Sequence, residues 1–346
     1  MSQPKDSCRS AGVIFLLFTV CFGSLAQESR VQTFPLVSLQ DLDLRTAKAE
    51  TVDYKDRKAL RLSPAGQPQE PFKSLILFRG VNFADGIIEA DVAVKATSPG
   101  GFRNPGFIGI GFRARSDARH YEMFFLRPGN SGSDDQIQRN HSVQYVSKPD
   151  FEFFKLRRPW PSVYEAYADL QPETWVHMKI EVAGRRASLY TNGAPHPVLI
   201  VDGLKGEDLT GGVGLWAGAA QENYFSNVRI VHARRQPIEN GGEPTGAWKI
   251  QYATDSGNFS GVLTLRRDGV IVSGAASGLL GSDVPVTGTW RNGYVEFAFH
   301  GTWSGPGGNP GEVTASIAGW IDGNTAKGRV SVTGRADGTW TATRKE

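Results

Sequence analysis

Short segments in which apolar and polar residues alternate recur along this chain, and they constrain its fold more than any other feature. Residues 84–96 (ADGIIEADVAVKA) and residues 106–115 (GFIGIGFRAR) both have this two-residue period. Because successive side chains of a strand point to opposite faces, the period is typical of strands with one buried face. No long segment of the sequence has the 3.6-residue apolar period of an amphipathic helix. We therefore predict an all-β protein.

Turn residues divide the 346-residue chain into two regions of different texture. Residues 27–235 contain about fourteen short strand-like segments, which predict a jelly-roll sandwich of two sheets. Residues 236–245 are rich in Gly, Pro and Glu and have no apolar period, which predicts a linker. Residues 246–346 contain about eight hairpin-linked segments, which predict a small antiparallel up-and-down β-barrel as an accessory domain.

Residues 1–26 have the pattern of a secretory signal peptide. Lys5 and Arg9 precede the apolar run AGVIFLLFTVCF, and the small residues of SLA follow it at residues 24–26. The apolar run is too short for a membrane-spanning helix, which needs about 20 residues. We therefore predict cleavage after Ala26, a secreted or periplasmic location, and no transmembrane segment.

The cysteines and the charge balance exclude several classes of function. Both cysteines, Cys8 and Cys21, lie in the predicted signal peptide, so the mature chain would have no disulfide, thiol nucleophile or cysteine-ligated metal. The 38 Lys and Arg against 35 Asp and Glu give a formal net charge of +3, too small to indicate a nucleic-acid partner. Near-neutral charge with 10% aromatic residues instead favours a neutral ligand such as a sugar.

Four stretches of the first region resemble the concanavalin A-like lectin/glucanase superfamily. They are FADGIIEADVAV, GFIGIGFRARSDARHYEMFFLRP, ETWVHMKIEVAGRRASLYTNG and GGVGLWAGAAQENYFSNVRI. Over residues 70–233 the closer resemblance is to the 3-keto-disaccharide hydrolase domain family, a group of mostly exported bacterial jelly rolls. The resemblance implies a jelly-roll fold and a carbohydrate ligand. The second region resembles lipocalin- or avidin-type barrels through its GAW opening and its tryptophans, an architectural likeness that says little about ligand.

One predicted strand suggests an open face for a ligand. The alternation in residues 106–115 places Gly109, Gly111 and Arg113 on the same side. Two glycines two residues apart leave that side bare, so a ligand can approach the sheet with Arg113 at its border. Glu122 follows in the next strand, where the resembled hydrolases carry a glutamate, and is a candidate acid or base. Alternatively, Arg113 and Glu122 form a structural cross-strand pair.

The stretch DDQIQRNHSVQY, residues 134–145, is the densest run of polar chemistry in the chain. As a metal site, it would bind a divalent cation through Asp134, Asp135 and His141. As a sugar-binding rim, it would offer hydroxyl partners and a stacking ring, namely Asp134, Asp135, Gln136, Arg139, Asn140, His141 and Tyr145. In the third interpretation, the aspartates and amides cap their own turn.

An aromatic insertion follows the polar stretch. Residues 145–167 (YVSKPDFEFFKLRRPWPSVYEAY) are rich in aromatic residues without a clean strand period. Long loops with aromatic residues are commonly functional, so the insertion favours the sugar-binding rim. Trp160 is its candidate stacking residue.

Three functions follow from these patterns. The leading hypothesis is an exported carbohydrate-binding protein that recognises glycans on the concave face of the jelly roll. The first alternative is a glycoside or 3-keto-glycoside hydrolase, with Glu122 or His141 as acid or base and Arg113 or a divalent cation stabilising an oxyanion or enolate. The second is a structural envelope protein without ligand. The site hypothesis requires Glu122, Arg113 and His141 to converge within about 8 Å in a concave pocket.

Overall fold

A computed structural model describes most of the chain from Arg30 to Lys345. The described ranges are 30–44, 47–64, 75–96, 105–157, 160–206, 210–218, 221–235, 242–291, 293–306 and 310–345. The predicted signal peptide and residues 236–241 of the predicted linker lie outside them.

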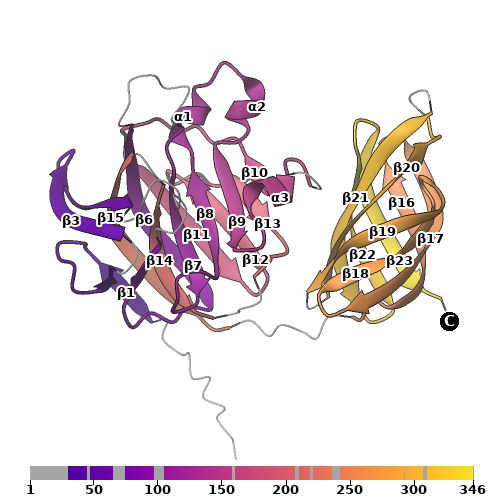
Figure 1. Ribbon diagram of the computed structural model, residues 1–346, viewed down its shortest axis with the longest axis horizontal. Helices are drawn as coiled ribbons and strands as arrows, with labels where there is room; N and C mark the ends of the chain where they lie inside the picture. The colour runs from indigo at the N-terminus through magenta and orange to yellow at the C-terminus, as the bar shows by residue number, and fades with distance from the viewer. Residues whose placement is uncertain are drawn as a thin grey trace, which may run out of the picture.

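Two antiparallel sheets form the predicted sandwich (Figure 1). The eight-stranded sheet has the order β13 (Leu199–Val201), β12 (Arg186–Thr191), β11 (Val176–Ala183), β6 (Asp85–Ala96), β15 (Gln221–Ala233), β4 (Arg57–Pro64) and β3 (Ala47–Tyr54), with β1 (Val31–Phe34) paired to β15. The seven-stranded sheet has the order β10 (Glu165–Ala166), β9 (Val143–Lys148), β8 (Tyr121–Leu126), β7 (Ile108–Ala114), β14 (Gly212–Ala217), β5 (Leu75–Phe78) and β2 (Leu42–Asp43).

The main core lies between the two sheets, where the alternation of the sequence places it. On β6, Ile88 and Val92 are fully buried, and on β7, Ile110 and Phe112 are fully buried against the same core. Burial of alternate apolar side chains from both sheets is what stabilises a sandwich. The predicted two-sheet fold is therefore confirmed.

The C-terminal strands close into an eight-stranded antiparallel barrel, which confirms the second predicted architecture. Its strands are β16 (Gly246–Thr254), β17 (Gly257–Asp268), β18 (Ile271–Gly278), β19 (Gly281–Arg291), β20 (Tyr294–Trp303), β21 (Gly311–Asp322), β22 (Thr325–Val332) and β23 (Ala336–Arg344). Gly269 and Gly323 have positive φ in the tight turns that join neighbouring strands. Trp248, Trp303 and Trp340 are buried in the barrel core.

Three short helices lie close to β9 in the sequence. They are α1 (Pro128–Ser131), α2 (Gln136–Arg139) and α3 (Phe153–Arg157). Helices α1 and α2 lie together at one end of the sandwich, while α3 lies on the side that faces the barrel (Figure 1). Among the residues that the structure describes, no helix is long and apolar enough to cross a membrane.

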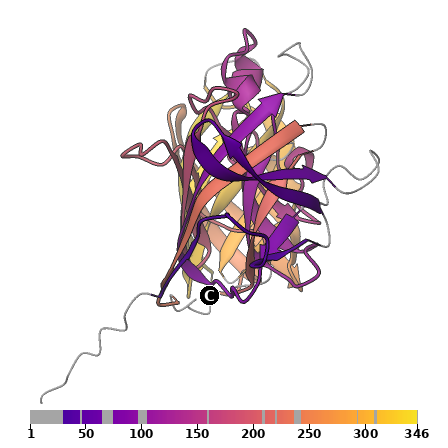
Figure 2. The same ribbon diagram turned by 90° about the vertical axis from the view of Figure 1, so that its left-hand side faces the viewer.

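The sandwich and the barrel are in contact. Lys205, in the segment after β13, forms an ion pair with Glu296 on β20. The guanidinium of Arg291, at the end of β19, lies 5.6 Å from the ring centroid of Phe151 in the sandwich. Seen from the sandwich side, the barrel lies behind the sandwich (Figure 2).

Candidate functional site

Arg113 does not lie on the glycine side of β7. Two residues of β7, Phe112 and Arg113, lie opposite one residue of β14, and Arg113 has a positive φ of 51°. This β-bulge breaks the alternation and turns the side chain into the sandwich. There Nη2 donates to Asp85 Oδ1 at 2.8 Å and to the backbone oxygen of Gly184 at 2.7 Å. The predicted ligand contact is corrected to a buried ion pair between the sheets.

Glu122 also points to the inner side of its sheet. It is the register partner of Phe112, and its side chain is fully buried. Its carboxylate accepts hydrogen bonds from the hydroxyl of Tyr145 and, at 2.6 Å, from the backbone N–H of Gly206. Burial raises the pKa of Glu122, and these two hydrogen bonds oppose the shift. Glu122 is therefore a protonatable carboxyl held by two fixed donors.

Tyr145 is not available for stacking on a sugar. The side chain is fully buried, because Tyr145 lies opposite Phe124 on the inner face of the sheet. Its hydroxyl donates to Glu122 and accepts from the backbone N–H of Lys205 at 2.7 Å. The ring therefore connects β9 to the segment after β13 and does not form a ligand rim.

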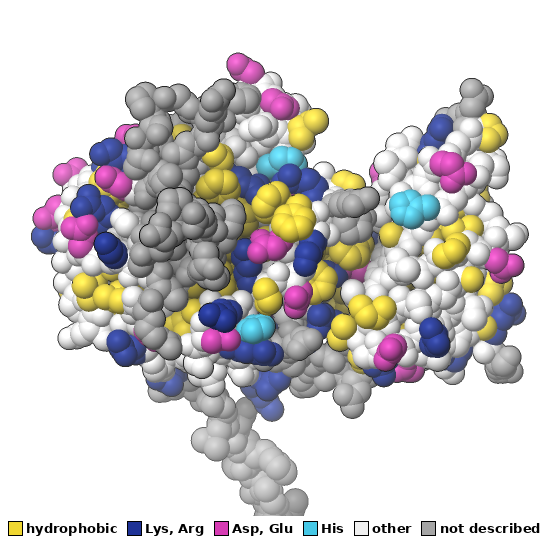
Figure 3. All heavy atoms as spheres, in the orientation of Figure 1, with side chains coloured by type: hydrophobic (Ala, Val, Ile, Leu, Met, Phe, Trp, Pro, Cys, Tyr) yellow, Lys and Arg dark blue, Asp and Glu magenta, His cyan; other side chains and the backbone are white. Residues whose placement is uncertain are grey.

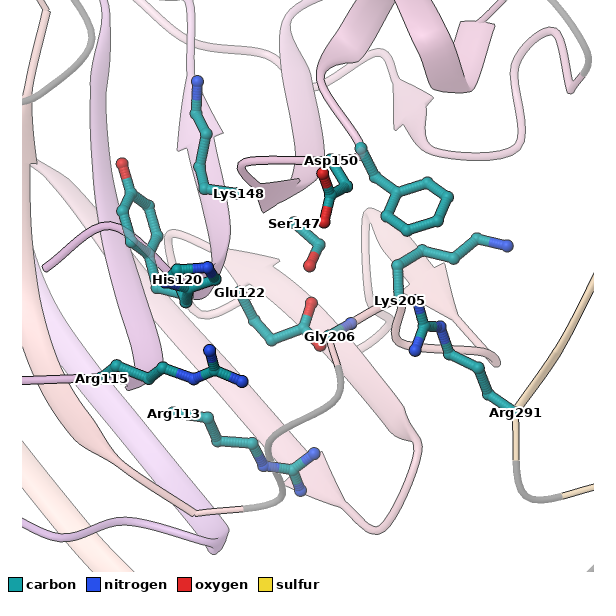
Figure 4. Close-up of a pocket in the computed structure, with 12 residues that line it drawn as sticks. Arg113, Arg115, His120, Glu122, Ser147, Lys148, Asp150, Lys205, Gly206 and Arg291 are labelled. Carbon is teal, nitrogen blue, oxygen red and sulfur yellow. Dashed lines mark hydrogen bonds between the residues drawn. The ribbon is translucent and has the colours of Figure 1, made fainter. Parts of the chain in front are cut away.

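Glu122 lines a small polar cavity at the boundary with the barrel, which we call the end cavity (Figure 4). Its volume of about 100 Å³ is well below the roughly 300–1,000 Å³ of typical ligand pockets. Arg115 and Arg291 point into it from opposite sides, and Lys205 borders it. The end cavity is too small for a sugar ring.

The polar stretch at residues 134–145 mostly satisfies its own turn. Asp135 caps α2, with Oδ1 accepting from the N–H of Ile137 at 2.8 Å. Gln136 Nε2 donates to Asn140 Oδ1 at 2.9 Å. Because their polar groups bond within the helix, Asp135, Gln136 and Asn140 correspond to the capping interpretation and do not form the expected ligand rim.

One further expectation for this region stays a prediction and one is corrected. Arg139 is half-buried, with its guanidinium 5.5 Å from the ring centroid of Tyr167, and its predicted role at a ligand rim stays a prediction. Within the described ranges, no three His, Cys, Asp or Glu side chains are grouped so that they could hold a metal ion. Asp134, Asp135 and His141 therefore do not form the expected cation site, since Asp135 is turned toward its own helix.

His141 lies apart from Glu122. Its Nδ1 is 3.0 Å from Glu165 Oε2. Burial lowers the pKa of His141 against the opposing effect of the Glu165 carboxylate, so the imidazole is neutral at neutral pH. Whereas Glu122 and Arg113 line the end cavity, His141 lines a different one. The predicted convergence of these three residues does not occur.

Trp160 is also buried. Only 8% of the residue is exposed, and the ammonium of Lys205 lies 4.4 Å from its ring centroid. The ring therefore packs at the boundary with the barrel, where it contributes a cation–π contact. It is not the exposed stacking residue that the sequence predicted.

A larger groove of about 330 Å³ lies on the outer face of the seven-stranded sheet, and we call it the outer groove. Its apolar lining is formed by Phe107, Met123, Phe125, Val146, Phe153 and Trp216. Its polar lining is formed by Arg127, Asn130, Gln138, His141, Lys148, Glu152 and Arg157. In Figure 3, hydrophobic side chains lie beside Lys and Arg side chains on this face, below α1 and α2.

The glycines of β7 shape the outer groove without leaving a bare strip. A Cβ at Gly109 would lie 2.7 Å from Cβ of Phe125, and one at Gly111 would lie 2.8 Å from Leu75. Side chains from β8 and β5 therefore lie over β7, because the glycines leave room for them. The expected open floor at Gly109 and Gly111 is corrected to a floor covered by apolar side chains.

The sequence pointed to this face but not to most of its residues. From residues 134–145, only Gln138 and His141 line the outer groove. The missed signal is in β8, whose sequence YEMFFL is apolar on both sides of the strand. A strand that is apolar on both sides is typical of a sheet with both faces buried. Met123 and Phe125 therefore indicate that the outer face of this sheet also carries an apolar surface.

Comparison with known proteins adds fold relatives only. No family model matches the chain, and no curated protein matches it. Similar solved structures include carbohydrate-binding module CBM66 from Bacillus subtilis, with 17% identity over 55% of this chain and 95% of that chain and a TM-score of 0.37. A protein of unknown function with a galectin-like fold from Bacillus subtilis has 16% identity over 59% and 96%, with a TM-score of 0.38.

A third solved structure is the exoplasmic/lumenal domain of VIP36 in its Ca²⁺/Man-bound form. It has 11% identity over 60% of this chain and 91% of that chain, with a TM-score of 0.42. All three are distant likenesses. The two-sheet architecture implied by the concanavalin A-like resemblance is present, and the narrower resemblance to the 3-keto-disaccharide hydrolase domain family stays a prediction.

Proposed function

We propose that the protein binds carbohydrate in the outer groove. The observation that supports this proposal is the combination of an apolar, aromatic floor with a rim of hydrogen-bonding side chains in one groove of about 330 Å³. This volume lies in the range of ligand pockets, roughly 300–1,000 Å³. The groove lies on the side of β7 that carries Gly109 and Gly111, where the sequence predicted a ligand. Most of its lining residues differ from the predicted ligand-binding residues.

The lining matches the two surfaces of a sugar. A pyranose ring has an apolar C–H face and an edge of hydroxyl groups that both donate and accept hydrogen bonds. Phe107 and Phe153 are half-buried, so part of each ring is accessible for stacking. The amides of Asn130 and Gln138 each carry a donor and an acceptor for hydroxyl groups.

The hydrolase alternative has less support. It requires Glu122 to reach a glycosidic oxygen, but Glu122 is fully buried beside the small end cavity. Both carboxylate oxygens already accept hydrogen bonds, from Tyr145 and Gly206. We therefore expect binding without turnover.

A glycan microarray followed by titration calorimetry tests the proposal. The purified protein is expected to bind a subset of glycans with micromolar to millimolar affinity and to release no reducing sugar from them. The absence of binding to any glycan up to millimolar concentration would contradict a carbohydrate-binding function. Release of reducing ends would instead favour the hydrolase.

We also propose that the protein is exported, which the N-terminal pattern of Lys5, Arg9 and the following apolar run supports. Expression in a bacterial host with separation of periplasm and cytoplasm tests this point. N-terminal sequencing of the exported chain is expected to begin at Gln27. An uncleaved chain in the cytoplasm would argue against export.

A further inference from the structure

We propose that the outer groove recognises acidic glycans, and that Arg127 binds their anionic group, a carboxylate or a sulfate ester. The inference rests on the proposed carbohydrate-binding function and deepens it by naming the ligand class. It follows from the surroundings of Arg127, a residue between β8 and α1 that lines the groove.

Arg127 is a buried cation without a carboxylate partner. Only 5% of the residue is exposed, and its Nη1 donates one hydrogen bond, to the backbone oxygen of His141 at 2.9 Å. Among the residues that the structure describes, no carboxylate lies within ion-pair distance of its guanidinium. A buried charge is unfavourable unless it is paired and hydrogen-bonded, so this arrangement indicates that an anion completes the site.

The neighbouring cations of the groove are paired. Lys148 forms an ion pair with Glu152, and Arg157 pairs with Glu165 through Nη2 at 2.5 Å. Three cationic side chains therefore stand against two carboxylates. The surplus positive charge belongs to Arg127, so the groove attracts a negatively charged ligand.

Aromatic rings surround Arg127 without occupying all of its donors. Its guanidinium carbon lies 5.7 Å from the ring centroid of Phe107, 4.8 Å from that of Phe125 and 5.5 Å from that of Phe153. Rings act on the face of a guanidinium, whereas its N–H groups point outward in its plane. An in-plane acceptor can therefore bind while the rings hold the group in place.

Carboxylates and sulfates match this donor geometry. The guanidinium fork donates two parallel hydrogen bonds to a planar carboxylate, and a charge-assisted pair of this kind is stronger than hydrogen bonds to neutral hydroxyl groups. Burial lowers the pKa of Arg127 to about 10. The nearby Arg157 adds to the shift and the Glu165 carboxylate, which is beyond ion-pair distance, opposes it, so the side chain remains charged at neutral pH. A uronic acid residue presents such a carboxylate directly on the sugar ring.

The test compares matched acidic and neutral ligands by titration calorimetry with the whole protein. Oligogalacturonate is compared with its methyl ester, which keeps the sugar backbone and removes the charge. A sulfated galactose oligosaccharide is compared with its desulfated form to separate the two anion sources. We expect at least one acidic form to bind about tenfold or more tightly than its neutral counterpart, with the difference shrinking as salt rises.

Variants locate the preference. Arg127→Met is expected to remove the preference, so that the acidic and neutral forms of a ligand bind this variant with similar affinity. Arg229→Met is the matched control, because Arg229 lies on the eight-stranded sheet and pairs with Glu89. Near-UV circular dichroism confirms folding of both variants. If Arg127→Met does not fold, the titrations of the wild-type protein with acidic and neutral ligands still test the predicted preference.

The outcomes are distinct. Equal binding of acidic and neutral forms by the wild type would overturn the inference and leave carbohydrate binding intact. A preference that Arg127→Met retains, with Arg127→Met folded, would also overturn it. Failure of every acidic and neutral oligosaccharide to bind would remove the proposed function itself, and the inference with it.

Discussion

Lys205 and Glu296 form a buried ion pair between the sandwich and the barrel. Their side chains are 2% and 0% exposed, and they come from the segment after β13 and from β20. Burial lowers the pKa of Lys205 and raises that of Glu296 well away from their ordinary values, so desolvation opposes both charged forms. In this buried site, each charged side chain therefore depends on the opposite charge of its partner to offset its desolvation.

Removing one partner is expected to destabilise the protein. Lys205→Met leaves Glu296 buried without its cation, which should lower the free energy of unfolding by about 3–5 kcal/mol. The double variant Lys205→Met/Glu296→Leu replaces both charges with apolar groups and should recover most of this loss. Urea denaturation followed by tryptophan fluorescence measures both. Equal loss in the single and double variants would contradict this role of the pair.

The raised pKa of Glu122 is expected to make the free energy of unfolding depend on pH. Because its folded-state pKa is raised, protonated Glu122 contributes stability that is fully present below its ordinary value of 4.5 and is lost as pH rises through the folded-state value. Glu122→Gln cannot ionise. Its stability relative to the wild type should therefore increase as pH rises above about 4.5, as measured by urea denaturation between pH 4 and 8.

Glu50→Gln is the control for this pH profile, because Glu50 is 55% exposed and pairs with Arg61 on the sheet surface. It should retain the wild-type profile. A Glu122→Gln profile parallel to that of the wild type would show that folding does not shift the pKa of Glu122, and it would contradict this prediction.

The ring of Phe153, which lines the outer groove, is expected to contribute to glycan binding by stacking on a sugar ring. Phe153→Ala removes a half-buried ring from the outer groove and should weaken glycan binding by about fivefold to tenfold. Its neighbour Phe154 is the matched control, because it is 56% exposed and does not line the groove. Calorimetry with one glycan ligand compares the two variants. Equal effects of both changes would place the ligand elsewhere.

The close packing around Gly109 beneath the outer groove leaves no room for a side chain at this position. Gly109→Ala would place Cβ 2.6 Å from the backbone oxygen of Phe124 and 2.7 Å from Cβ of Phe125. The overlap should destabilise the protein by about 1–3 kcal/mol and weaken glycan binding as the floor shifts. Gly132→Ala has no heavy atom within 4 Å of the added Cβ and should leave both unchanged. Thermal unfolding and calorimetry provide the two measurements.

The sequence predicted architecture better than it predicted the site. The two-residue period and the turn residues indicate a sandwich and an eight-stranded barrel, and both are present. The candidate site residues were chosen for their polar chemistry and for the faces that alternation assigned to them. Tyr145 and Trp160 were expected at a ligand rim and are buried, because their rings pack where β9 and residues 160–164 meet the segment around Lys205.

The sequence by itself determined that this chain forms strands and which of their faces are apolar, because a two-residue period depends only on local backbone geometry. Tertiary structure decided what those faces meet. The bulge that turns Arg113 toward Asp85 depends on pairing with β14, about a hundred residues further along the chain. The cluster of Arg127 with Phe107 and Phe153 likewise forms only when separate segments fold over one sheet. Local patterns carry no record of such pairings, because side-chain identity does not specify which distant strand lies alongside.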